Sequence, residues 1–75
     1  MTPAQCRAAR ALIGLTQPEL AKAAGVGLST IVDFEKERRV VSIKAQAKLQ
    51  ETLEKVGIDF IPANDRGVGV RLRKS

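Results

Sequence analysis

Two helical segments with clearly marked ends, joined by a tight turn, constrain this chain more than any other feature. Residues 14–38 read GLTQPELAKAAGVGLSTIVDFEKER. Thr16 can cap the first segment, and Glu19 can complete a capping box by reaching back to the backbone of Thr16. Gly25 is a typical helix stop, and the next helical pattern begins after Gly27. The sequence therefore predicts two short helices separated by a turn of about three residues.

Further helices precede and follow this pair. A capping-box pattern of Thr2 with Gln5, with Pro3 at the first helical position, predicts a first helix over residues 3–13 that stops at Gly14. The third helix should span residues 28–36, and a fourth should begin after Ser42 and end before Gly57. The residues expected on their buried sides are Cys6, Ala9, Leu12 and Ile13; Leu20, Ala21 and Ala24; Ile31 and Phe34; and Ala45, Leu49, Leu53 and Val56.

The hydrophobic period changes after Gly57. Ile58 and Phe60 flank Asp59, and farther on Val68, Val70 and Leu72 alternate with glycine and arginine. This alternation predicts two β-strands, with Pro62 closing the first and residues 63–67 forming the turn. We therefore expect a helical unit over residues 1–57 and a β-hairpin over residues 58–75. An isolated hairpin is marginal in water, so it must lie on the helices or pair with another chain.

Size and charge narrow the range of partners. The chain has 75 residues, with 13 Lys and Arg against 8 Asp and Glu, which gives a formal net charge of +5. A domain this small buries only about 60% of its unfolded surface, so we expect a homo-oligomer that adds apolar burial. The basic balance favours an anionic partner, although a basic surface can also serve solubility alone.

Several classes of function are disfavoured by what the sequence lacks. Cys6 is the only cysteine and there is no histidine, so neither an intramolecular disulfide nor a structural zinc site is expected. No cofactor, no catalytic residue and no enzymatic activity are predicted. Cys6 falls on the apolar side of its helix and is expected to act as a small buried hydrophobe. Without a secretory or membrane-spanning pattern, the chain is expected to be cytoplasmic and to have no membrane partner.

From Arg10 to Glu35 the chain resembles the Cro and lambda-repressor family of helix-turn-helix DNA-binding domains, also called the XRE family. The resemblance extends more loosely over residues 3–56 and leaves the hairpin outside the common core. It implies a mainly α, four-helix fold in which the third helix enters the major groove of double-stranded DNA. It also implies an ion pair between Arg10 and Glu35 that links the first and third helices.

The resemblance assigns DNA contacts to specific positions. Gln17, beside Thr16 at the start of the second helix, would contact phosphate, because helix N–H groups there suit an anion. Side chains from the first two turns of the third helix would contact base edges. Phosphates would be contacted by the basic cluster that follows this helix, which consists of Lys36, Arg38, Arg39 and Lys44. The predicted DNA-binding residues are Thr16, Gln17, Leu28, Ser29, Thr30, Val32, Asp33, Lys36, Arg38, Arg39 and Lys44.

Several of these positions depart from the family pattern and keep a second interpretation. Leu28 can pack in the core instead of meeting a thymine methyl, and Asp33 can pair with Lys36 instead of accepting from cytosine N4. Gln17 can simply be an exposed first-turn residue, and the basic cluster a solvated charge run. Glu37 stands where the family often has glycine, so the third helix either runs on towards Arg39 or frays without a left-handed stop.

These observations favour a DNA-binding transcription regulator, most simply a repressor. It would bind a pseudo-palindromic operator as a homodimer with its two third helices about 34 Å apart. We expect the dimer contact at the hairpin by strand addition, with the apolar stripe of the fourth helix as the other candidate. The alternative function is a protein-interaction module on the same fold, an antitoxin or antiactivator with a protein partner. The predicted dimer residues are Phe60, Ile61, Val68, Val70 and Leu72.

Overall fold

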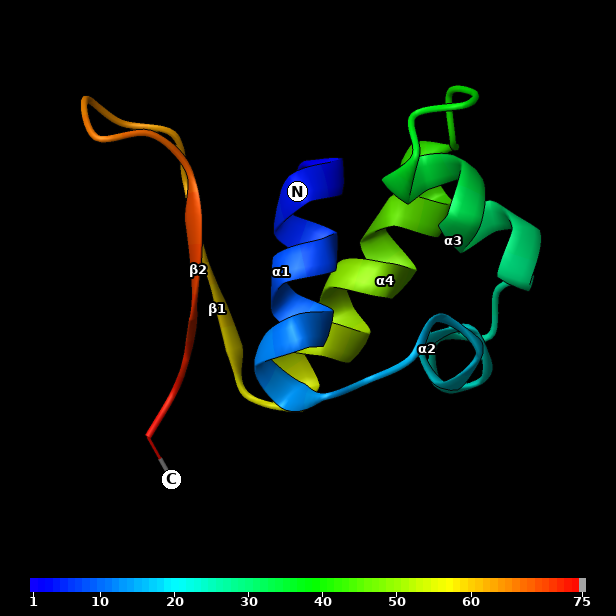
Figure 1. Ribbon diagram of the computed structural model, residues 1–75, viewed down its shortest axis with the longest axis horizontal. Helices are drawn as coiled ribbons and strands as arrows, with labels where there is room; N and C mark the ends of the chain where they lie inside the picture. The colour runs from blue at the N-terminus through cyan, green and yellow to red at the C-terminus, as the bar shows by residue number, and fades with distance from the viewer. Residues whose placement is uncertain (75) are drawn as a thin grey trace.

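Four helices and a terminal hairpin follow one another along the chain in the computed structural model, which describes residues 1–74 (Figure 1). This is the mainly α architecture with a C-terminal hairpin that the sequence predicts, and the prediction is confirmed. The elements are α1 (Pro3–Ile13), α2 (Gln17–Ala24), α3 (Leu28–Glu35), α4 (Ile43–Lys55), β1 (Ile58–Ile61) and β2 (Gly69–Leu72).

Capping side chains set the beginnings of three helices. Thr2 with Gln5, and Thr16 with Glu19, each form a complete capping box, in which the threonine side chain accepts a backbone N–H and the longer side chain accepts one in return. The Ser42 hydroxyl accepts from the Ala45 N–H at the start of α4. α1 and α2 end at glycines in the left-handed conformation, which costs glycine no steric strain.

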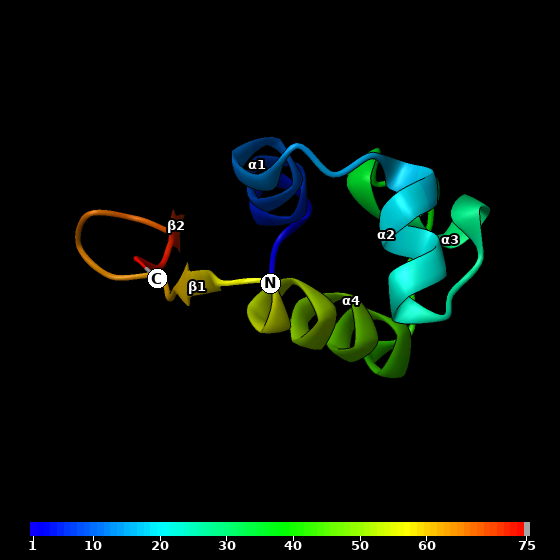
Figure 2. The same cartoon turned by 90° about the horizontal axis from the view of Figure 1, so that it is seen from below.

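The core lies where α1, α2, α3 and α4 meet, and α4 packs against both α1 and α2 (Figure 2). Every helix contributes fully buried apolar side chains, and the first residue of β1 closes the cluster from the hairpin side. The core side chains are Cys6, Ala9, Leu20, Ala21, Ile31, Phe34, Val41, Leu49, Leu53 and Ile58. Because α2 and α3 both bury their inner faces here, the turn between them is held in one geometry.

Glu37 ends α3 in a way that the sequence analysis did not foresee. α3 stops at Glu35, and Glu37 takes the left-handed conformation with φ 56°. The Glu37 N–H donates to the Phe34 carbonyl (3.2 Å), and the Arg38 N–H donates to the Asp33 carbonyl (2.9 Å). This is a Schellman stop, built on a residue type that carries a steric cost there. Both expectations, a longer helix and an end without a left-handed residue, were therefore wrong.

Two apolar residues expected on buried sides are exposed. Val56 is the C-cap of α4, so the helical stripe ends before it and the side chain is exposed. Leu12 lies about 100° around α1 from Ile13, beyond the edge of the stripe that faces the core, and is also exposed. The helical periodicity therefore predicted the buried sides of these helices correctly but included two residues that lie outside them.

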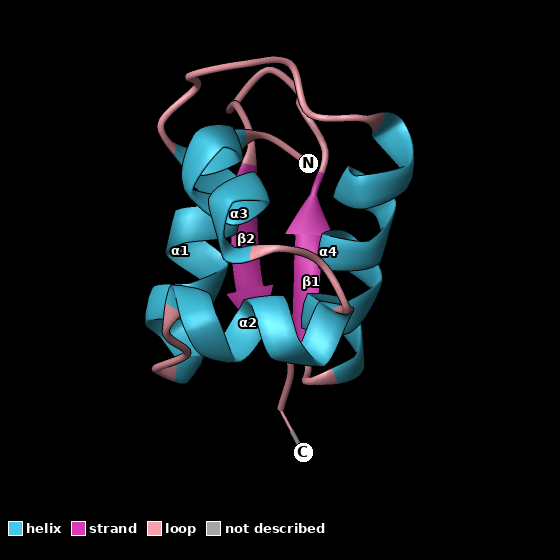
Figure 3. Cartoon of the chain, turned by 90° about the vertical axis from the view of Figure 1, so that its right-hand side faces the viewer, coloured by secondary structure: helices cyan, strands magenta, loops and turns pink. Residues whose placement is uncertain are grey.

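The hairpin forms a second layer that covers α1 and α4 (Figure 3). β1 and β2 pair antiparallel, with Ile58 opposite Leu72 and Phe60 opposite Val70. Ile58 is fully buried, and Phe60 and Val70 pack against the core, so this side of the hairpin faces the helices. The predicted strand at Val68 starts one residue later than expected. In two perpendicular views the hairpin and α3 lie at opposite ends of the molecule (Figures 1 and 2).

Gln5 ties the hairpin to α1. While its Oε1 atom accepts the Thr2 N–H in the capping box, its Nε2 atom donates to the carbonyls of Ile61 (3.2 Å) and Gly69 (2.9 Å). These two carbonyls belong to a pair of residues that face each other across the strands. One buried amide therefore caps a helix and clamps both strands.

Two arginines near the end of the chain form ion pairs with an aspartate of the same hairpin. Asp59 accepts from Arg71 (3.2 Å) and from Arg73 (2.7 Å), and Arg73 also donates to the Glu54 carbonyl at the end of α4. Hydrogen bonds from Arg73, and then from Arg71, lower the pKa of the Asp59 carboxyl. Because the hairpin and α3 lie at opposite ends (Figure 1), these arginines do not extend the basic surface next to α3.

Candidate nucleic-acid interface

The first two turns of α3 present polar and apolar side chains outward. Gly27 begins the helix with backbone alone, since no side chain caps it. Leu28 is 45% exposed and Ser29 is exposed, so the core interpretation of Leu28 is wrong. Thr30 and Val32 are half-buried and flank the exposed Ser29 position on either side around the helix. The residues expected to meet base edges thus lie on the accessible surface of α3.

Asp33 forms an ion pair on α3, although not with Lys36, the alternative partner. Its Oδ2 atom accepts from Nε of Arg39 at 2.8 Å, and Nη2 of Arg39 donates to the Thr30 hydroxyl at 3.4 Å. The Schellman turn after α3 folds the chain back, which brings a residue six positions away onto the helix. The alternative pairing of Asp33 with Lys36 is therefore wrong, because Arg39 is the partner. Arg39 is therefore held along the outer surface of α3, where its charge offsets that of Asp33.

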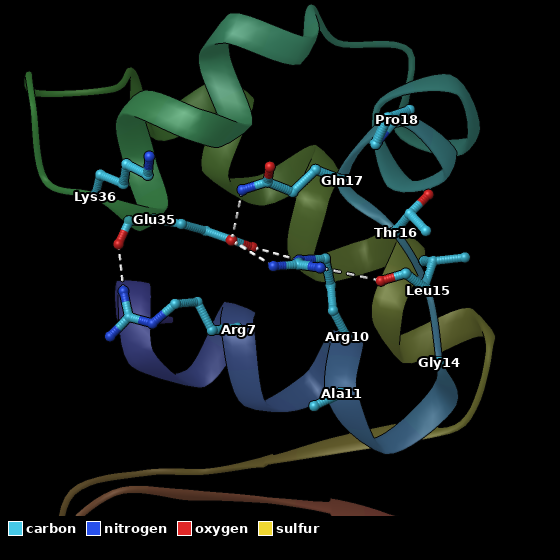
Figure 4. A pocket seen from close by; sticks show the side chains of 10 residues that line it. All are labelled: Arg7, Arg10, Ala11, Gly14, Leu15, Thr16, Gln17, Pro18, Glu35 and Lys36. Carbon is cyan, nitrogen blue, oxygen red and sulfur yellow. Dashed lines mark hydrogen bonds and ion pairs between the residues drawn. The ribbon is translucent and has the colours of Figure 1, made fainter.

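Behind this surface, Glu35 joins α1, α2 and α3 (Figure 4). Arg10 donates to both carboxylate oxygens, with Nε 2.6 Å from Oε2 and Nη2 2.7 Å from Oε1. Gln17 donates to Oε1 at 3.0 Å, and the Cys6 thiol donates to Oε2 at 3.2 Å. Four hydrogen bonds thus satisfy one buried carboxylate. They connect the first turn of α2 and the end of α3 to α1.

The network also sets the protonation states of its members. Burial alone would raise the pKa of Glu35, but hydrogen bonds from Arg10, Cys6 and Gln17 outweigh it and hold the pKa below its usual value. The hydrogen bond to Glu35 raises the pKa of Arg10. Burial, together with the neighbouring carboxylate, raises the pKa of the Cys6 thiol to about 12. The carboxylate and guanidinium therefore stay charged, and the thiol stays neutral.

A basic hollow opens over this network. It has a volume of about 600 Å³ and is lined by α1, the start of α2 and the end of α3, including Arg7, Gln17 and Lys36 (Figure 4). Arg7 donates to the backbone carbonyl of Glu35. The Gln17 side chain, expected to contact phosphate, is here bonded to Glu35. The basic cluster predicted to contact phosphate is exposed, and its members are Lys36, Arg38, Arg39 and Lys44.

Sequence reasoning missed two side chains that organise these surfaces. Cys6 was expected to be a buried hydrophobe, and it is buried, but it also donates to Glu35. Gln5 was recognised for its part in the capping box but not for its bonds to the hairpin. Both contacts join residues 29 or more positions apart, so no local spacing indicates them. A glutamine as the third residue of a helix is the only sign, and it suggests a cap alone.

The connection of α2 to α3 through a short turn, with polar side chains exposed at the start of α3, defines a helix-turn-helix domain. The comparison with protein families agrees, because residues 7–61 match a family described as helix-turn-helix. The match covers more than half of the chain, so the protein belongs to this family and is of the Cro and lambda-repressor, or XRE, type. It is a DNA-binding transcription regulator of that type. The comparison with curated proteins gives no match.

Neither a membrane span nor a metal cluster occurs in the described part of the chain. Within residues 1–74, no helix is long and apolar enough to cross a membrane. Over the same residues, no group of three or more His, Cys, Asp or Glu side chains is placed to hold a metal ion.

Proposed function

We propose that this regulator is a repressor that binds a pseudo-palindromic operator as a homodimer, with α3 of each copy in the major groove. The observation that carries the proposal is the outer surface of α3, where Arg39 is bonded to both Asp33 and Thr30. An unpaired Asp33 carboxylate would repel the phosphate backbone. Paired with Arg39, it instead lies beside a guanidinium that can face DNA. Occupying a promoter is the simplest way in which such a domain represses transcription.

Base recognition would come from two kinds of side chain on α3. Arg39 and the hydroxyls of Ser29 and Thr30 can bond base edges, and the exposed Leu28 can meet a thymine methyl. Arginine is the usual partner of guanine O6 and N7 because its donors form a planar fork. The hydrogen bond from Asp33 orients that fork before DNA arrives, so less side-chain freedom is lost on binding.

Phosphate contacts would flank this reading surface. Lys36, Arg38 and Lys44 are exposed beside α3 and at the start of α4, and each phosphate neutralised adds affinity that falls with salt. At the start of α2, Thr16 and Gln17 place helix N–H groups where an anion is favoured. The Gln17 side chain would contact phosphate after leaving Glu35, whose bonds to Arg10 and Cys6 remain.

The predicted dimer residues occupy different places on the hairpin. Phe60 packs against the core of its own chain, and Ile61 belongs to the opposite side of β1. Val68 and Leu72 are exposed and Val70 is half-buried, all on or beside β2. Val68, Val70 and Leu72 are therefore the hairpin residues available to a dimer contact, and Phe60 would support that contact from behind.

Fluorescence anisotropy against DNA upstream of the protein's own gene, beside a scrambled duplex, tests the proposal. We expect tight binding to the first duplex only, with a steep salt dependence. Arg39→Ala should weaken operator binding about tenfold or more and reduce discrimination, as loss of a base contact does. The matched variant Arg38→Ala should weaken both duplexes about equally.

Equal, weak binding to both duplexes would contradict the operator-reading role. The protein-interaction alternative would then take its place, with the exposed Leu28 on α3 as part of the contact surface. Isothermal titration with a candidate protein partner would separate the two functions, because a 1:1 complex with that partner requires no DNA.

A further inference from the structure

The outward side of α1 is apolar, which is unusual for a helix at a protein surface. The exposed residues of α1 are Ala4, Arg7, Ala8, Ala11 and Leu12, so one charge accompanies four apolar side chains. At about 100° per residue, the four apolar positions share one side of the helix, opposite Cys6 and Ile13. A helix that is apolar on its outer as well as its inner side is normally covered.

This apolar side continues onto the hairpin, since β2 packs alongside α1 (Figure 3). Leu12, Val68 and Leu72 are 47%, 48% and 44% exposed. Between the helix and the strand lies a shallow hollow of about 190 Å³, lined by Ala4, Gln5, Ala8, Val68, Gly69 and Val70. We call the exposed apolar side of α1 together with this edge of β2 the α1–β2 face. Small side chains line the hollow of this face, and the Leu12 side chain protrudes from it.

We propose that the α1–β2 face binds a second copy of this chain, with the two α1 helices antiparallel and crossing at Ala8. Ala4 and Leu12 lie four residues before and four residues after Ala8. A twofold axis at Ala8 therefore places Leu12 of each copy opposite Ala4 of the other. The projecting leucine then enters the hollow, and the alanines allow the two helices to approach closely.

The composition of the face favours a second copy over a charged partner. No acidic side chain belongs to it, and Arg7 at its rim donates back to the Glu35 carbonyl. Each copy carries both the projecting Leu12 side chain and the hollow. The two fit together reciprocally only when a twofold axis relates the two copies, as in an isologous interface. The face is centred on the side of α1 away from Glu35 and α3, and of its residues Ala11 alone also borders the basic hollow. Pairing therefore leaves the outer surface of α3 accessible in both copies.

A second exposed apolar pair is too small to account for a stable dimer. Val40 and Ile43 are 95% and 85% exposed between α3 and α4. Two side chains on each copy bury far less than the about 1,200 Å² at which specific interfaces begin. The α1–β2 face is larger and has seven apolar residues, which are Ala4, Ala8, Ala11, Leu12, Val68, Val70 and Leu72. A contiguous exposed apolar patch marks an interaction site more often than scattered apolar side chains do.

Sedimentation equilibrium of the full chain, without DNA, tests this proposal. The wild type should be dimeric at high micromolar concentration, and Ala8→Glu should weaken dimerisation at least about tenfold by placing two carboxylates at the crossing point. Ala23→Glu is the matched control, because Ala23 is an exposed alanine on α2 outside the face. A monomeric wild type, or a dimer that Ala8→Glu leaves unchanged, would overturn the proposal.

Disulfide trapping gives a second readout that does not depend on tolerance of a glutamate. Ala8→Cys should cross-link two chains on mild oxidation, since the twofold brings the two side chains together. Ala23→Cys should give no such dimer, and Cys6 is buried and does not compete. Absence of cross-linking in Ala8→Cys would contradict the crossing point. The proposal rests on the proposed function only for the role of the dimer. A dimer that does not bind DNA would contradict the proposed DNA binding and leave the α1–β2 contact standing. A monomer that binds DNA would contradict the α1–β2 contact and leave DNA binding standing.

Discussion

Arg10 holds the carboxylate of Glu35 with two guanidinium nitrogens, at 2.6 Å and 2.7 Å. The pair joins α1 to the last residue of α3, and Gln17 extends it to the first residue of α2. A bidentate pair fixes orientation as well as distance, because the planar guanidinium and carboxylate must lie in register. The position of the reading helix is therefore set by a polar contact beneath it as well as by the apolar core.

Glu35→Gln should lower the free energy of unfolding by about 3 kcal/mol, because it leaves Arg10 without its charge partner and disturbs the bonds from Gln17 and Cys6. Urea denaturation at neutral pH measures the loss. Glu51→Gln, an exposed glutamate on α4, should change stability by less than about 0.5 kcal/mol. Equal effects of the two variants would mean that the network contributes little.

The same carboxylate should make stability depend on pH in the acidic range. Because the pKa of Glu35 is lower in the folded protein, its contribution is complete above the unfolded pKa of about 4.3 and is lost as the pH falls through the lower, folded pKa. Urea midpoints of the wild type should therefore decline below about pH 4 more steeply than those of Glu35→Gln. Parallel declines would show that other carboxylates dominate acid unfolding.

Glu37→Gly should stabilise the protein by about 1 kcal/mol, since glycine takes the left-handed conformation at φ 56° without the clash that a side chain brings. Thermal unfolding followed by circular dichroism measures the shift. Lys36→Gly is the control, because Lys36 has φ −94° and glycine there only adds freedom to the unfolded chain. A loss of stability in Glu37→Gly would indicate that its side chain makes a compensating contact.

Gln5→Glu should destabilise the protein by about 1–3 kcal/mol. A glutamate can still accept the Thr2 N–H, but it loses the amide donor and faces the carbonyls of Ile61 and Gly69. The other capping box supplies the control, since Glu19→Gln keeps the cap and Glu19 has no bond to the hairpin. Urea denaturation compares them, and the idea of a clamp fails if both exchanges cost the same.

Cys6 should be inert to thiol reagents in the folded protein, because it is fully buried and burial raises its pKa to about 12. Absorbance-based thiol titration at pH 8 should detect no reaction until denaturant is added. In Ala23→Cys the same assay should detect one thiol at once, since that position is exposed. Rapid reaction of the wild type would mean that α1 opens readily.

The helix ends and the fold class could be predicted from sequence alone. Capping residues, glycine stops and hydrophobic periodicity act over three or four positions along the chain. Thr2, Thr16 and Ser42 therefore predicted three helix starts, and each is an N-cap in the structure. The change of period after Gly57 indicated the hairpin for the same local reason. Glu37 was the exception, because a left-handed glutamate breaks the residue preference on which such predictions depend.

Tertiary structure alone decided which partners the polar side chains take and which apolar residues remain exposed. Gln5 reaches residues more than 50 positions away, and Asp33 pairs with Arg39 only because the chain folds back at the Schellman turn. Leu12 follows the helical pattern of a core residue, yet the width of the packed stripe leaves it outside. Local patterns set secondary structure through the backbone, whereas these contacts depend on how whole elements pack, which no short window of sequence contains.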